Sequence, residues 1–157
     1  MDKESKPFEL GRQLSVLHRH GRAFFDQRMS AYELGSGQHT FLFFLYNNNG
    51  ATQDEISRAL ELDKATTARA IHKLEERGFV RRENGEKDKR VNHVFLTEKA
   101  YEIQRDMRSF SDEWKQVLVN ELDEQELVLL EKLINKLSTN ASTYREAHCK
   151  KGGHHVK

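Results

Sequence analysis

The sequence predicts a mainly α-helical chain that carries one small β-hairpin, and three observations support this fold class. Apolar residues recur every three or four positions over several long stretches, as they do along one face of an amphipathic helix. Two short strand-like runs, residues 79–83 and 92–96, flank a charged loop that contains glycine. The only proline is Pro7, so no later residue of that kind interrupts a long helix.

The first half of the chain predicts one long helix and one short helix. Residues 8–33 carry Leu10, Leu14 and Leu17 at helical spacing. After a glycine-rich break comes the dense apolar run FLFFLY, residues 41–46. Six apolar residues also fit a strand. We favour a short buried helix that starts near Ser36, because a helix–loop–helix pattern follows at once.

The next two helices are marked by their capping residues. Thr52 and Glu55 form a capping box, which starts a helix that ends near Leu60. Asp63 is the expected N-cap of a helix over residues 64–77, and Gly78 the expected C-cap. The inward face of this second helix is expected to hold Ala68, Ile71 and Leu74. Its outward face then centres on Thr66, Arg69 and Lys73.

A helix-turn-helix followed by a basic hairpin is an arrangement that reads duplex DNA. The hairpin loop carries Lys87, Lys89 and Arg90, and such a ribbon tip suits a path along phosphates. The net charge is only +1, but residues 58–94 hold ten Lys and Arg against seven Asp and Glu. The positive charge therefore gathers at the motif, although a mixed solvated surface also explains this balance.

The C-terminal part predicts two further helices. Thr97 and Glu98 are expected to cap a helix that runs to about residue 121, and Asp123 is expected to cap the last helix. Their apolar stripes exceed what a small DNA-binding core needs, so we expect a homodimer built from the first and last helices. The expected organisation is a single domain over residues 1–157. It has dimerisation helices at 8–33 and 98–145, a core at 36–97 and a flexible tail at 146–157.

The motifs of the central region resemble those of MarR-type transcription regulators. They are T-x-R-x-I-x-K-L-E at 67–75, G-F-V-x-R at 78–82, D-x-R at 88–90 and L-T at 96–97. The resemblance implies a winged helix-turn-helix core flanked by long dimerisation helices. It also implies a homodimer that binds pseudo-palindromic operators, commonly as a repressor that a small-molecule effector releases.

The resemblance also implies residue roles. Thr66, Thr67, Arg69 and Lys73 would face the major groove, and Arg90 would enter the minor groove with Asp88 bracing it. Arg82 would contact DNA or brace the wing. The expected DNA-binding residues are Lys64, Thr66, Thr67, Arg69, Lys73, Arg82, Lys87, Asp88, Lys89 and Arg90. Two alternatives stay open: Asp88 and Arg90 form a simple surface ion pair, or the scaffold is a dimeric protein-interaction module with little DNA binding.

Other chemistry is less well supported by the sequence. An effector pocket is expected by position at Phe24, Arg28, His39, Phe43 and Arg108. His18, Glu33 and His39 occupy the region where some MarR-like regulators bind zinc, but we expect no metal and no cofactor. No catalytic arrangement is present, so we expect no enzyme. The single cysteine and the lack of an apolar leader predict a cytoplasmic protein.

Overall fold

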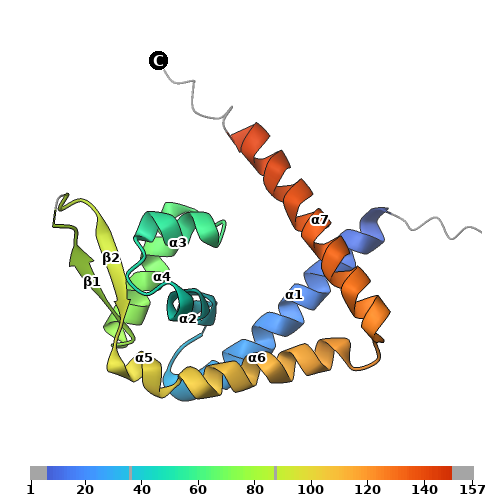
Figure 1. The fold of residues 1–157 in the computed structure, drawn as a ribbon, viewed down its shortest axis with the longest axis horizontal. Helices are drawn as coiled ribbons and strands as arrows, with labels where there is room; N and C mark the ends of the chain where they lie inside the picture. Colours follow the sequence, from blue (N-terminus) through green and yellow to red (C-terminus); the bar gives the residue numbers. More distant parts are fainter. Residues whose placement is uncertain (1–6, 36, 87, 150–157) are drawn as a thin grey trace, which may run out of the picture. The chain divides into compact units, whose positions relative to one another are not determined.

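The computed structural model describes residues 7–35, 37–86 and 88–149, which form the helices and strands of Figure 1. In chain order these are α1 (Pro7–Met29), the 3-10 helix η1 (Ser30–Tyr32), α2 (Gln38–Asn47), α3 (Gln53–Ala59), α4 (Lys64–Glu76), β1 (Val80–Asn84), β2 (Asn92–Leu96), α5 (Glu98–Glu102), α6 (Gln104–Val119) and α7 (Glu124–Cys149). The predicted fold class, mainly α with one hairpin, is confirmed. Contacts divide the chain into two compact units, residues 1–114 and 115–157, and each is described by itself.

The core of the first unit lies under α2, which confirms the helix predicted for the FLFFLY run. Phe41, Leu42 and Leu45 of α2 are buried against residues of α3, α4 and the hairpin. Each such side chain contributes about 1.5–3 kcal/mol when it leaves water. This shared core fixes α3, α4 and the hairpin as one body.

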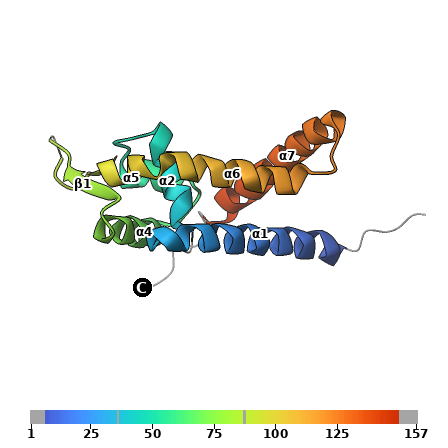
Figure 2. The ribbon, with the colours of Figure 1, turned by 90° about the horizontal axis from the view of Figure 1, so that it is seen from below.

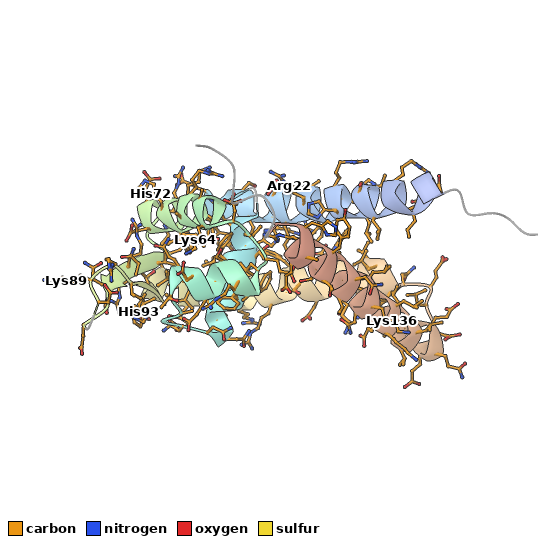
Figure 3. The ribbon with its side chains drawn as sticks, turned by 90° about the horizontal axis from the view of Figure 1, so that it is seen from above. Arg22, Lys64, His72, Lys89, His93 and Lys136 are labelled. Atoms are coloured by element: carbon orange, nitrogen blue, oxygen red, sulfur yellow. The ribbon has the colours of Figure 1, made fainter. Side chains whose placement is uncertain are left out.

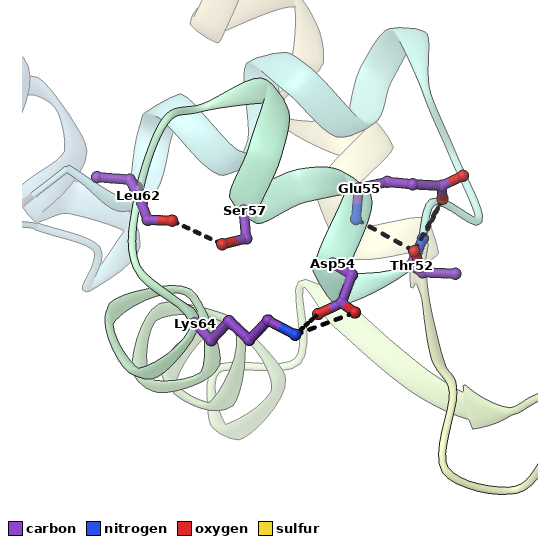
Figure 4. A network of polar contacts seen from close by, with 6 residues as sticks. All are labelled: Thr52, Asp54, Glu55, Ser57, Leu62 and Lys64. Atoms are coloured by element: carbon purple, nitrogen blue, oxygen red, sulfur yellow. Dashed lines mark hydrogen bonds and ion pairs between the residues drawn. The ribbon is translucent and has the colours of Figure 1, made fainter. Parts of the chain in front are cut away.

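The predicted N-caps of the helix-turn-helix form, at Thr52 for α3 (Figure 4) and at Asp63 for α4. The predicted C-cap Gly78 is wrong, because α4 ends at Glu76 and its C-cap is Arg77. The backbone N–H of Glu55 donates to Thr52 Oγ1 over 3.2 Å, and the backbone N–H of Thr52 donates to Glu55 Oε2 over 2.7 Å. Between the helices, Ser57 Oγ donates to the carbonyl of Leu62 over 2.6 Å, which closes the turn. The hydrogen bonds that the helix ends lack internally are thus supplied by side chains.

The hairpin pairs β1 with β2 in antiparallel register, from Val80 opposite Leu96 to Asn84 opposite Asn92. The segment before α3 adds a partial third strand, because the Gly50 N–H donates to Val94 O and the Val94 N–H donates to Ala51 O, each over 2.9 Å. Gly50 has φ +87°, and a Cβ there would lie 2.8 Å from the Phe95 ring. Glycine is therefore required at this close approach.

Helix α6 packs beside α1 through its residues up to Trp114 (Figure 2). The Trp114 ring lies 5.2 Å from the Phe24 ring and covers Gly21, where a Cβ would meet it at 3.3 Å. Tyr32 Oη donates to Asp106 Oδ2 over 2.5 Å, and this bond raises the pKa of Tyr32 to about 12. The single helix predicted from residue 98 to 121 is wrong in one respect, since it breaks at Ile103 into α5 and α6.

Two other sequence predictions are corrected at the helix ends. Thr97 occupies the N-cap position of α5 but does not cap it with its side chain; its hydroxyl donates instead to the carbonyl of Gly78 over 2.6 Å. This bond ties the end of β2 to the turn before β1. In the second unit, α7 continues to Cys149, so a flexible tail that begins at residue 146 is wrong, and residues 150–157 lie outside the described chain.

Helix α7 begins at a capping box, as predicted from Asp123. The backbone N–H of Glu126 donates to Asp123 Oδ1 over 2.8 Å, and the Asp123 N–H donates back to Glu126 Oε2 over 3.0 Å. The helix exposes a set of large apolar side chains: Val128, Leu129, Leu130, Leu133, Ile134 and Leu137. Among the described residues, none of the helices combines the length and apolar character that crossing a membrane requires.

Candidate DNA interface

Helix α4 turns one face to the core and one to the outside. The buried face is formed by Thr67, Ile71 and Leu74, which are four and three residues apart. Arg69 and Lys73 are exposed, as predicted, but Thr67 is only 1% exposed. The prediction that Thr67 faces the groove is therefore wrong. Ala68, which was expected on the inward face in the position that Thr67 occupies, is half-buried.

The first turn of α4 is held by a chain of hydrogen bonds. The Thr66 N–H donates to Asp63 Oδ1 over 2.8 Å, and the Thr66 hydroxyl donates to Asp63 Oδ2 over 2.6 Å. Arg69 Nη2 in turn donates to Thr66 Oγ1 over 3.0 Å. The Thr66 hydroxyl, more than any other cause, lowers the pKa of Asp63. The Arg69 guanidinium is thus directed toward the N-terminus of the helix.

Lys64 begins α4 and pairs with the first turn of α3. Its Nζ lies 3.1 Å from Asp54 Oδ1 and 3.3 Å from Asp54 Oδ2 (Figure 4). Both side chains are largely exposed. Figure 3 labels Lys64 on α4 and Lys89 on the hairpin, so each of these two elements contributes a lysine to this surface.

The hairpin tip presents Arg90 in a fixed position. Its Nε lies 3.1 Å from Asp88 Oδ1, its Nη2 lies 3.1 Å from Asp88 Oδ2, and its backbone N–H donates to the same carboxylate over 3.0 Å. The side-chain bonds to Arg90 are the largest cause of the lowered pKa of Asp88. The Arg90 side chain is nevertheless 91% exposed. Lys89 beside it is exposed too, whereas Lys87 lies outside the described residues.

Arg82 joins the middle of β1 to α4. Its Nε and Nη2 lie 2.9 Å and 2.5 Å from Glu75 Oε2, and its backbone N–H donates to Glu75 Oε1 over 3.1 Å. The Arg82 side-chain bonds are the main reason that the pKa of Glu75 is lowered. Of the two roles expected for Arg82, its contacts are those of a brace for the wing.

The sequence reasoning missed two residues of this surface. His72 lies on the exposed side of α4, and its Nε2 is 3.4 Å from Glu76 Oε1. Arg81 of β1 places its guanidinium 4.8 Å from the centre of the Phe95 ring. The i, i+4 spacing of a His and a Glu could have identified the first pair. Alternation along two paired strands could have identified the second.

A separate cavity of about 400 Å³ lies between α1, α2 and α6. His39 lines it, and its ring stacks on Phe25 with centroids 4.3 Å apart. Burial lowers the pKa of His39. Of the other four residues expected at an effector pocket, Phe24, Arg28 and Phe43 pack beside the cavity without lining it, and Arg108 is exposed.

Two of the three residues considered for zinc have other partners. Glu33 forms an ion pair with Arg77, the C-cap residue of α4, and His39 stacks on Phe25. Among the residues that the structure describes, no cluster of three or more His, Cys, Asp or Glu could hold a metal ion.

Comparison with known proteins finds one family. A family model described as the MarR family matches residues 34–91. The HTH-type transcriptional regulator BilQ of Clostridium symbiosum is 32% identical over 108 residues, which cover 69% of this chain and 72% of that protein.

Solved structures agree with the sequence comparison. A MarR transcriptional regulator from Methanosarcina mazei Go1 is 37% identical with a TM-score of 0.79, over 88% of this chain and 99% of that one. A mutant of MarR from E. coli complexed with operator DNA is 22% identical with a TM-score of 0.76, over 87% of this chain and 99% of that one. At that identity, the second likeness shows the fold alone.

The helix-turn-helix, the paired hairpin and the cations on both define a winged helix-turn-helix transcription regulator. The chain belongs to the MarR family, because its relatives of more than 30% identity, aligned over more than two thirds of their length, are regulators of this kind. The family and the relatives are transcription regulators, not enzymes.

Proposed function

We propose that the chain is a homodimer that binds a pseudo-palindromic operator and represses transcription until a small molecule releases it. In this proposal α4 enters the major groove and the hairpin tip enters the adjacent minor groove. The observation that carries it is Arg90, which is 91% exposed although Asp88 grips its guanidinium on two nitrogens. A long cation held in one orientation in solvent is suited to a narrow groove of negative potential.

The recognition helix supports the same proposal. Arg69 and Lys73 are exposed on α4, and Lys64 stands at its start. The relative from E. coli is complexed with operator DNA, which agrees with the use of this fold for DNA. A protein-interaction module would not need cations on both α4 and the hairpin tip.

The exposed apolar surface supports the homodimer. Helix α1 exposes Leu10, Leu14 and Leu17 at helical spacing, and α7 exposes the six apolar residues listed above. Solvated faces of this kind are covered by another copy in symmetric oligomers. We expect a mass of twice 18.4 kDa by light scattering at micromolar protein, and a mass of 18.4 kDa would contradict the dimer.

The cavity at His39 is the proposed effector site. It is lined by aromatic rings, by His18 and Arg22 and by the start of α2, so it combines apolar walls with a few polar groups. A screen of small molecules that monitors release of the protein from operator DNA would identify the effector.

The experiment that tests DNA binding is nuclease protection of the region upstream of the protein's own gene. We expect two protected half-sites whose centres are about one helical turn apart, because a two-fold dimer presents two recognition helices. Protection of no segment above a random duplex control would contradict the proposal.

A further inference from the structure

A charged cleft of about 480 Å³ separates the helix-turn-helix from the hairpin. Its lining comes from α3, from α4 and from the hairpin. It includes the cations Arg58, Lys64 and Arg90 and the acid Asp54. With a helix in the major groove and a wing in the next minor groove, the phosphate strand between the two grooves must cross this surface. The cleft therefore faces DNA backbone if the proposed function holds.

Lys64, the cation that begins the recognition helix, is already engaged in the free protein. Its Nζ lies within 3.3 Å of both carboxylate oxygens of Asp54. Asp63, the residue just before Lys64, is committed to the cap of α4 through Thr66. Asp54 thus supplies the negative charge that neutralises Lys64.

The pair is open to exchange. The side chains of Lys64 and Asp54 are 79% and 62% exposed, so water and a phosphate can reach both partners. Exposed ion pairs contribute little to stability, whereas a lysine beside a phosphate releases a counterion and gains affinity. A phosphate that binds Lys64 must first displace the Asp54 carboxylate, which carries a negative charge like its own.

We propose that Asp54 masks Lys64, so that a backbone phosphate gains this cation only by displacing the carboxylate. The inference rests on the proposed DNA binding and adds a residue that opposes it. Asp54 limits affinity for duplex DNA of any sequence, because phosphates are common to all sequences. Because Asp54 weakens the contacts with phosphates, a larger part of the affinity for the operator comes from the base-facing residues of α4.

The test compares Asp54→Asn, Lys64→Gln, the double variant and the wild-type protein on a random-sequence duplex and on the protected upstream duplex. Asp112→Asn on α6 is the matched control, since it removes the same charge from an exposed position away from the cleft. Affinity is measured over a salt series, and the melting temperature of each variant is recorded.

We expect Asp54→Asn to bind both duplexes roughly twofold to fivefold more tightly at low salt, by the same factor on each. The plot of log affinity against log salt should steepen by about one unit, because an unmasked Lys64 adds one net phosphate contact. Most of this gain should vanish in the Lys64→Gln background, and Asp112→Asn should show a much smaller gain.

Three results would overturn the masking role. An equal gain with and without Lys64 would mean that Asp54 acts only as a repelling charge. A lower melting temperature with weaker binding would make the pair a structural tie between α3 and α4. Unchanged affinity would mean that Lys64 meets no phosphate. If the wild-type protein binds neither duplex, the proposed DNA binding fails together with this inference.

Discussion

Thr67 is the buried residue whose substitution gives the clearest test of the packing of α4. Its side chain is 1% exposed, and Oγ1 has no hydrogen-bond partner among the described residues. A buried hydroxyl without a partner costs about 1–3 kcal/mol. Valine has nearly the same shape and the same β-branched stiffness in a helix but no hydroxyl.

Thr67→Val should therefore stabilise the protein by about 1 kcal/mol, taken at the low end of that range. For a chain of this size, that corresponds to a rise in melting temperature of about 2–4 °C in differential scanning calorimetry. Thr66→Val is the matched control. It should give no such gain, because the Thr66 hydroxyl bridges Asp63 and Arg69.

The same two variants also separate the core from the DNA-facing surface. Thr67→Val should leave operator affinity unchanged, whereas Thr66→Val should weaken it by releasing Arg69. A fall in melting temperature on Thr67→Val would show that the hydroxyl bonds to a backbone carbonyl one turn back, as threonines in helices can. The reasoning from an unpaired hydroxyl would then be refuted.

Three further predictions concern other parts of the first unit. Arg82→Ala should weaken DNA binding and lower the melting temperature slightly. The pKa of Glu75 is lowered in the folded protein, so the stability from the Arg82–Glu75 pair should be present above the ordinary pKa of Glu and be lost as the pH falls. If the melting temperature of Arg82→Ala depended on acid pH as that of the wild-type protein does, this prediction would be contradicted. Lys89→Ala should weaken binding equally on operator and random DNA and flatten the plot of log affinity against log salt by about one unit. Arg69→Ala should weaken binding to the operator more than binding to random DNA. Equal losses on both duplexes for Arg69→Ala would mean that α4 reads no bases. Burial lowers the pKa of His39, so the unfolded chain binds this proton more readily than the folded chain does. Stability should therefore fall as the pH drops through the ordinary pKa of His, and His39→Phe should reduce this acid sensitivity in thermal melts. An unchanged pH profile in His39→Phe would show that His39 is not its source.

The helices and the hairpin could be predicted because local rules govern them. The capping boxes at Thr52 and Asp123 and the N-cap at Asp63 all form, because a side chain that satisfies free N–H groups acts over three residues. The second strand also has the predicted bounds, residues 92–96. Such features depend on neighbours in sequence, which the sequence displays.

The errors come from packing and from contacts that local patterns in the sequence do not display. The resemblance to the family placed Thr67 at the major groove, yet Thr67 shares the buried face of α4 with Ile71 and Leu74. Thr97 was expected to cap the helix that starts at Glu98. Its hydroxyl instead donates a hydrogen bond to the carbonyl of Gly78, 19 residues earlier. The break at Ile103 was missed since the apolar spacing continues across it. The effector residues were assigned by position only, and just His39 lines the cavity.

The brace at the hairpin tip is the central claim, and it is tested most directly by operator affinity of Asp88→Ala, Arg90→Ala and the double variant at one fixed salt concentration. Arg90→Ala should weaken binding by roughly tenfold or more, as for a specific arginine contact. Asp88→Ala should weaken it too, although it removes an acid near a polyanion, because the free guanidinium then loses side-chain freedom on entering the groove. The double variant should bind no worse than Arg90→Ala. Tighter binding by Asp88→Ala, or an effect of Asp88→Ala that persists undiminished without Arg90, would contradict the account.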